Sequence, residues 1–208
     1  MNSFEIDLRR AVFSGRFLIG LVIQIAILYI SGFKSDLYYI SVPVLCTFPY
    51  STAWLQDYQS GYIKPYLQRS GTASYIMGKI LACGISGGLL ETAGCFIFYL
   101  IKSEEALKNG WLLIFMSGML WAVFSATLAA ISESRYIAFG GSFVVYYILV
   151  MLHERYFKKL YCIYPYEWLS PEHTWVFGIQ GVVILTMAIT IILIFIYYEV
   201  LRRCIRNV

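Results

Sequence analysis

Glu91 is the residue in this sequence best placed to carry chemistry, because it is an acidic side chain deep within a long apolar run. A carboxyl group in lipid is costly, so such a residue is by default a functional candidate. Gly84, Gly88 and Cys95 share its helical face by spacing, and Gly84-x-x-x-Gly88 lets two helices pack closely. Two interpretations stay open. Glu91 is either protonated and hydrogen-bonded between helices, or part of a substrate path or gate.

The other residue types that support catalysis do not form a recognisable centre. The histidines, His153 and His173, lack an acidic cluster at metal-ligand spacing, and the pair Glu104-Glu105 lies in a loop. The five cysteines show no metal-binding spacing, and no GxxxxGK(S/T) phosphate-binding loop occurs. We therefore expect no catalytic residue, cofactor site or metal site, and no enzyme activity from this chain by itself. An intramembrane enzyme that uses Glu91 would need a partner base or metal.

The composition indicates an integral membrane protein. Hydrophobic residues make up 60% of the 208 residues and charged residues only 13%, against roughly 25% charge in soluble domains. Because a helical crossing takes about 20 apolar residues, the sequence predicts one all-α transmembrane domain over residues 1–208 with six spans. Their expected ranges are 17–33, 37–54, 75–101, 111–131, 137–152 and 175–198. Pro43 and Pro49 predict kinks in the second span.

Two segments outside the spans have patterns of their own. Residues 3–15 predict an amphipathic helix in the membrane interface, with Leu8 and Ala11 on its apolar face and Asp7 and Arg10 on its polar face. Residues 153–174 form an aromatic loop that we expect in the headgroup layer on the outer side. With both termini cytoplasmic, most of the 16 lysines and arginines fall on the inner side, as the positive-inside rule requires.

The segment 56–71 is the longest polar break between apolar runs. Asp57 leaves the second span, and Ser60-Gly61 allows a sharp turn. The residues after this turn predict a short amphipathic cytoplasmic helix with large apolar side chains at Tyr62, Ile63, Tyr66 and Leu67 and positive charges at Lys64 and Arg69. A solvated connector would not need four large apolar residues in this stretch. We therefore expect a surface that receives a soluble partner.

This arrangement resembles the membrane subunit of type-2 ABC transporters, the ABC-2 permease family. After the second span, that family has an acidic residue, a small residue with Gly, an apolar pair, a basic or polar turn, and a Tyr or Val followed by Gly-Lys at the start of the third span. The matching positions are Asp57, Ser60-Gly61, Tyr62-Ile63, Arg69-Ser70, Tyr75 and Gly78-Lys79. The sequence departs from the pattern in two ways: the family more often has Glu at the position of Asp57, and a large ectodomain is missing.

The resemblance implies a multi-pass subunit in the cell membrane that exports a peptide, an antimicrobial compound or another amphipathic molecule. It implies two soluble ATPase subunits per complex, which bind ATP and Mg, and a second permease chain, identical or related. The ATPase-coupling residues would be Asp57, Ser60, Gly61, Tyr62, Ile63, Tyr66, Leu67 and Arg69. Glu91, Gly84 and Gly88 would serve the substrate path or helix packing, and Tyr161, Tyr164, Pro165, Tyr166 and Trp168 the outer gate.

The alternative is a non-transporting membrane sensor or immunity protein that binds a ligand through the aromatic outer loop. It predicts no ATPase partner, and functional effects concentrated at Tyr161–Trp168. A nucleic-acid partner is not expected, because the net charge of +4 comes from basic residues scattered at span ends.

Overall fold

The computed structural model describes residues 3–102, 110–175 and 177–206. Within these residues every regular element is a helix. The α-helices are α1 (Ser3–Val12), α2 (Gly15–Ser31), α3 (Asp36–Leu45), α4 (Ala53–Gln59), α5 (Ile63–Ser70), α6 (Thr72–Lys102), α7 (Trp111–Ser132), α8 (Arg135–Arg155), α9 (Pro165–Leu169) and α10 (Ile179–Arg206). A short 3-10 helix, η2, spans Tyr161–Ile163.

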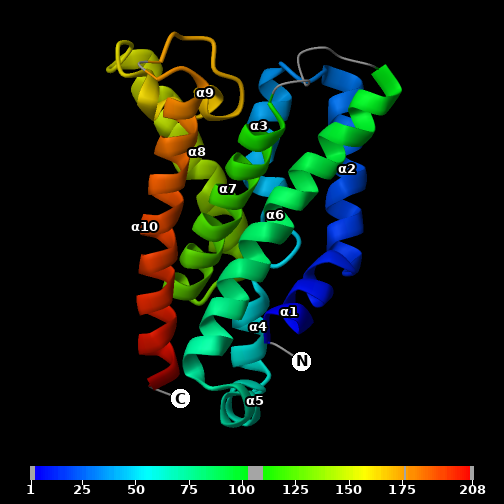
Figure 1. Ribbon diagram of the computed structural model, residues 1–208, viewed down its shortest axis with the longest axis vertical. Helices are drawn as coiled ribbons and strands as arrows, with labels where there is room; N and C mark the ends of the chain where they lie inside the picture. The colour runs from blue at the N-terminus through cyan, green and yellow to red at the C-terminus, as the bar shows by residue number, and fades with distance from the viewer. Residues whose placement is uncertain (1–2, 103–109, 176, 207–208) are drawn as a thin grey trace.

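The long helices run side by side as an elongated bundle (Figure 1). Among the described residues, α6, α7, α8 and α10 are each long and apolar enough to cross a membrane. The helices α1 and α2 would make a fifth crossing if they count as one span bent by 48°. Both chain ends lie at one end of the bundle together with α4 and α5, and α9 lies at the opposite end (Figure 1). These apolar helices indicate a protein embedded in a membrane.

The helices α6 and α7 form the centre of the bundle. They pack closely against each other, and α1 and α2 pack along α6 while α8 and α10 pack along α7. Gly84 and Gly88 lie on the α6 face toward α7, where an added Cβ would contact Met119 and Phe115. Small residues at such positions let two backbones approach, which is the main way helices associate in lipid.

The segment expected as a second continuous span is broken. The helix α3 ends at Leu45, turns cover residues 46–52, and the separate helix α4 follows. Pro43 lies in the last turn of α3 and Pro49 in the turn region. Proline lacks a backbone N–H and clashes with the preceding helical turn, so two prolines six positions apart end the helix rather than only kink it. Because of this break, Tyr50 and the first residue of α4 are buried at the end of the bundle where both termini lie.

The N-terminal helix is also different from its expected form. It ends at Val12, and Ser14 caps α2 by accepting a hydrogen bond from Phe17 N (3.1 Å). The face of α1 that carries Asp7 and Ala11 is buried against α6. The sequence prediction that Asp7 lies on the polar outer face is therefore wrong, because a charged partner on α6 makes its burial favourable.

Candidate functional site

The helix α5 leaves the bundle at the end where both termini lie, and a tight turn connects it to α4 (Figure 1). In this turn the Ser60 hydroxyl donates to the Asp57 carbonyl (3.2 Å), and Tyr62 N donates to the same oxygen (3.1 Å). Gly61 adopts φ +70°, a conformation that favours glycine. A second glycine, Gly71 with φ +74°, ends α5 and starts the return into α6. Because of these two turns, the axis of α5 does not continue that of α4 or α6.

The side chains of α5 divide into an anchored and an open face. Ile63 is buried, Leu67 is half-buried, and the Tyr66 ring packs edge-on against Tyr75 of α6 at 5.3 Å between centroids. Tyr62 is half exposed at 50%. The side chain of Arg69, also expected at this surface, lies outside the described residues. The helix therefore has an apolar face anchored on the bundle and an exposed aromatic side chain at its start.

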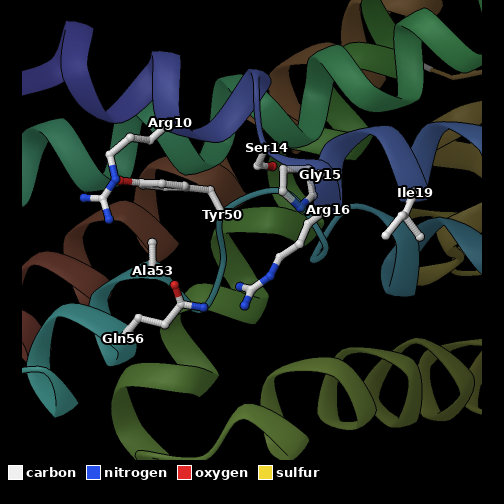
Figure 2. A pocket seen from close by; sticks show the side chains of 9 residues that line it. Arg10, Ser14, Gly15, Arg16, Ile19, Tyr50, Ala53 and Gln56 are labelled. Atoms are coloured by element: carbon white, nitrogen blue, oxygen red, sulfur yellow. The ribbon is translucent and has the colours of Figure 1, made fainter.

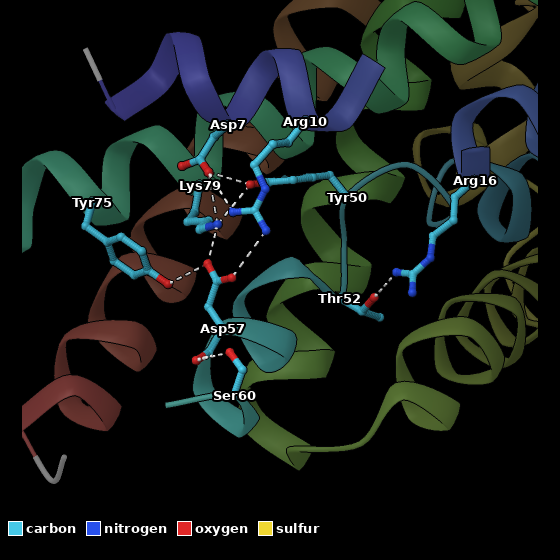
Figure 3. A network of polar contacts seen from close by, with 9 residues as sticks. All are labelled: Asp7, Arg10, Arg16, Tyr50, Thr52, Asp57, Ser60, Tyr75 and Lys79. Carbon is cyan, nitrogen blue, oxygen red and sulfur yellow. Dashed lines mark hydrogen bonds and ion pairs between the residues drawn. The ribbon is translucent and has the colours of Figure 1, made fainter. Parts of the chain in front are cut away.

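On the bundle side of α5 lies a buried network that we call the charge cluster (Figure 3). It joins α1, the turn after α3, α4 and α6, and consists of Asp7, Arg10, Tyr50, Asp57, Tyr75 and Lys79. Lys79 Nζ is its centre, 2.6 Å from Asp57 Oδ2, 3.0 Å from Asp7 Oδ1 and 2.9 Å from the Tyr50 hydroxyl. The Tyr75 hydroxyl donates to Asp57 Oδ2 at 3.3 Å.

The charges of this cluster balance. Lys79 and Asp7 are almost fully buried, at 2% and 1% exposure, and Asp57 is 4% exposed. Arg10, which is about half exposed, adds a second positive charge 3.6 Å from Asp57 Oδ1. Two carboxylates therefore face two cations. Such a network is costly to desolvate, and removing one member leaves an uncompensated buried charge.

The sequence motif contained only Asp57, Tyr75 and Lys79 of this cluster. Asp57 and Lys79 were expected as separate positions of a family motif, and the structure brings them into direct contact. Asp7 and Tyr50 were missed as site residues. The one usable signal was Lys79 itself, because a lysine within an apolar run needs an acidic partner. Asp57 is buried rather than open to a partner, so any contribution it makes to coupling acts through Lys79.

Glu91 lies near the middle of α6 in a second buried polar group, fully buried and hydrogen-bonded. Gln24 Nε2 donates to Glu91 Oε2 at 2.7 Å and the Tyr38 hydroxyl donates to it at 3.1 Å. The Cys46 thiol donates to Oε1 at 3.4 Å. The carboxyl group of Glu91 thus connects α6 to α2 and α3, while its Cβ and Cγ lie against Gly118 of α7, the helix that Gly84 and Gly88 also face. These contacts with α7 agree with the shared face that the sequence predicted for Glu91, Gly84 and Gly88, but the sequence did not identify Gln24 as a partner.

The expected outer-gate residues gather around α9 at the other end of the bundle. Trp168 is buried, its ring stacks on Trp121 of α7 at 6.1 Å, and its Nε1 donates to Cys162 O (2.9 Å). Tyr166 stacks on Tyr164 at 4.7 Å between centroids. Pro165, buried, starts α9, and Tyr161 of η2 stacks on His173. These side chains pack on one another and on the end of the bundle, and the predicted position of this segment in the headgroup layer stays a prediction.

A buried carboxylate fixes the segment after α9. Glu167, 3% exposed, accepts hydrogen bonds from His173 Nδ1 (2.7 Å), Trp175 Nε1 (3.1 Å) and the backbone N–H of Glu172 (3.2 Å). Burial opposes ionisation of this carboxyl, but the hydrogen bonds outweigh it and hold the pKa of Glu167 below its usual value. The carboxylate therefore fixes Glu172, His173 and Trp175 after α9.

The residues considered for metal binding or catalysis do not come together in the described part of the chain. His173 pairs with Glu167, whereas His153 stacks on Tyr164 at 4.2 Å. The described residues contain no group of three or more His, Cys, Asp or Glu placed to hold a metal ion. Glu104-Glu105 lies outside the described residues.

The chain matches no protein-family model, no curated protein and no solved structure.

Proposed function

We propose that this chain is the membrane-spanning permease subunit of an ATP-driven type-2 ABC transporter. Its cargo would be a peptide, an antimicrobial compound or another amphipathic molecule. The motif resemblance around residues 57–79 and the separate amphipathic helix α5 at its centre support this proposal. A short helix with an anchored apolar face and an exposed aromatic start is suited to sit in a groove of a soluble partner.

The observation that carries the proposal is the buried ion pair between Asp57 and Lys79, 2.6 Å apart. Asp57 ends the segment before α5 and Lys79 belongs to the helix after it. A displacement of α5 is therefore transmitted through both of its attachments to α6 rather than absorbed by flexible loops. Asp7 joins α1 to the same lysine, so α1, α4 and α6 would move as one body.

In this proposal the chain crosses the cell membrane six times with both termini in the cytoplasm. The crossings are α2, the broken segment from α3 through α4, then α6, α7, α8 and α10. Two soluble ATPase subunits bind ATP and Mg, and a second permease chain, identical or related, completes the complex. The position of both chain ends beside α5 supports this orientation (Figure 1).

ATP binding would close the ATPase pair and move α5, and α6 would transmit the movement past Glu91 to the outer end. The hydrogen bonds of Glu91 to Gln24 and Tyr38 hold α2 and α3 against α6 in the state described here. An alternating-access mechanism needs two packed arrangements whose balance the ATPase changes. The α9 segment would serve as the outer gate, because its rings pack over the bundle end.

Affinity purification in mild detergent tests this proposal. The wild-type chain should retain a soluble P-loop ATPase in near-equal amount, as counted by mass spectrometry. Tyr62→Asp should lose the ATPase while keeping a monodisperse chain, since Tyr62 is half exposed. Tyr156→Asp is the matched control. Tyr156 directly follows the last residue of α8 and is a more exposed tyrosine than Tyr62. Equal ATPase recovery from both variants would contradict the coupling role of α5.

A ligand sensor is the second candidate, and a specific cavity favours it. A space of about 200 Å³ at the outer end is lined by Lys34, Asp36, Tyr39, Tyr166 and Glu172. It offers charged groups of both signs and tyrosine hydroxyls to a small polar ligand. If the chain is a sensor, Tyr166→Ala would abolish its response to the ligand, and no ATPase would copurify with the chain. Loss of function in Tyr62→Asp with an intact Tyr166→Ala response would reject the sensor.

A further inference from the structure

A cavity of about 480 Å³ opens where the chain bends between α1 and α2 (Figure 2). Arg10 comes from α1, Arg16 from α2, and Gln56 from α4 on the facing side. The guanidinium groups of both arginines project into the space toward the side where Gln56 lies, and Ile19 lies at the far side from Arg10 (Figure 2). The cavity thus has a cationic part and an apolar part.

Arg16 has no carboxylate within ion-pair distance among the described residues, whereas Arg10 is paired with Asp57. Its guanidinium is instead held by neutral groups. Nη1 donates to Thr52 Oγ1 at 3.3 Å. When the Gln56 amide is assigned with its oxygen toward Arg16, this oxygen accepts from both Nη1 and Nη2, the latter at 2.8 Å. A guanidinium has five N–H donors, so donors remain for a ligand. The side chain is oriented, and its charge is not neutralised.

The start of α2 adds donors to the same cavity. Ser14 caps the helix through Phe17 N, but the N–H groups of Gly15 and Arg16 have no backbone acceptor in the described part of the chain. Gly15 lines the cavity, and a Cβ there would meet no atom within 4 Å. A helix N-terminus with free N–H groups favours an anion. Arg16 and the N-terminus of α2 therefore both favour a negatively charged ligand.

The surroundings of the cavity indicate where the ligand comes from. Phe13, Leu18 and Ile19 are all exposed apolar side chains next to Arg16, with Phe13 at 81%. In a membrane protein such a surface faces acyl chains, and a basic residue at its edge lies at the depth of the lipid headgroups. A ligand with an anionic head and an apolar tail would match both parts of the cavity.

We propose that this cavity is a phosphate-binding site whose ligand is the headgroup of an anionic membrane phospholipid. Arg16 contacts the phosphate through its planar donor pair, the α2 N-terminus donates to a further phosphate oxygen, and Ile19 contacts the lipid tail. Arg10 connects the site to the charge cluster through Asp57. The site does not depend on the proposed transport function, because its ligand binds this chain alone.

Native mass spectrometry of the purified full chain tests the proposal. The chain is titrated with dioleoylphosphatidylglycerol, with dioleoylphosphatidylcholine for comparison, and inorganic phosphate is added in a separate arm. We expect Arg16→Gln to weaken phosphatidylglycerol binding about tenfold, the effect of losing one charge-assisted contact. Arg9→Gln, the control, removes an equal charge from exposed Arg9 of α1, which does not line the cavity, and should leave binding unchanged.

A second variant keeps the test decisive if Arg16→Gln alters the fold. Gln56→Glu leaves Arg16 in place and sets a carboxylate against it, so it should weaken phosphatidylglycerol binding without removing an arginine. Inorganic phosphate that binds with the same Arg16 dependence and displaces the lipid would support the phosphate site and assign a soluble source. Phosphatidylglycerol binding that is equal in Arg16→Gln, Gln56→Glu and Arg9→Gln would overturn the proposal.

Discussion

Replacing Lys79 with methionine should destabilise the protein far more than any surface lysine substitution. Methionine has a similar length but no charge, so Asp7 and Asp57 would remain buried with only half-exposed Arg10 as a cationic neighbour. Removing one partner of a buried ion pair costs about 3–5 kcal/mol. For a chain of this size, such a loss lowers the midpoint of thermal unfolding by on the order of 10 °C.

A double-mutant cycle measures how much of this loss comes from unbalanced charge. Asp57→Asn alone leaves Lys79 paired with Asp7 at 3.0 Å, so it should cost less than Lys79→Met. In Lys79→Met/Asp57→Asn the remaining charges, Asp7 and Arg10, balance again. The double variant should therefore be more stable than the sum of the single losses predicts, by at least about 1 kcal/mol.

The matched control is Lys34→Met, and the readout is thermal unfolding of the purified chain in one detergent. Lys34 pairs with Glu172 at 3.9 Å, and both side chains are more than half exposed. An exposed pair contributes about 0–1 kcal/mol, so this variant should unfold close to the wild type. If Lys79→Met and Lys34→Met unfold at the same temperature, or if the cycle is additive, the reasoning about the charge cluster is refuted.

Two further predictions concern the other buried carboxyl groups. Glu91→Leu removes the carboxyl oxygen that accepts from both Gln24 and Tyr38, leaving Gln24 only the Glu91 backbone carbonyl and Tyr38 only the Cys95 thiol. This should lower the free energy of unfolding by about 2–4 kcal/mol, whereas Glu91→Gln retains a side-chain acceptor and should cost less. Denaturant titration of both variants checks this, and equal losses would contradict it. Glu167 has a lowered folded-state pKa, so its stabilisation is present above the unfolded-state pKa of about 4.3 and is lost as pH falls through the lower folded value. Thermal unfolding of wild type and Glu167→Gln should therefore differ at pH 7 and converge below pH of about 4; a constant difference across that range would argue against the carboxylate as the cause.

The long central helices were predictable because their sequences are nearly continuous apolar runs. Helices α6 and α7 cover the predicted runs 75–101 and 111–131 and extend only a few residues beyond them. Length and hydrophobicity determine such elements locally. The second predicted span is not one continuous helix for a local reason too, since Pro43 and Pro49 limit α3 and the apolar composition of the turn region hides the break.

The buried polar groups were harder to predict, because each partner comes from a distant part of the sequence. Asp7 and Lys79 are 72 positions apart, and a helical wheel of residues 3–15 assigns Asp7 to solvent on polarity alone. Gln24 is a similar case, an isolated amide within an apolar helix that becomes meaningful only beside Glu91, 67 positions away. Unpaired polar residues in apolar runs predict that a partner exists, but only the packing of the helices identifies it.

Photo-crosslinking from position 62 in native membranes tests whether α5 contacts a soluble ATPase. A benzophenone amino acid in place of Tyr62 would extend from the exposed start of α5 toward any soluble partner, and the same substitution at Tyr156 reports on the opposite end. If α5 contacts the ATPase, position 62 forms an adduct with a P-loop ATPase, identified by mass spectrometry, and position 156 forms no such adduct. Adducts from position 62 that contain lipid or other proteins but no ATPase would contradict this contact.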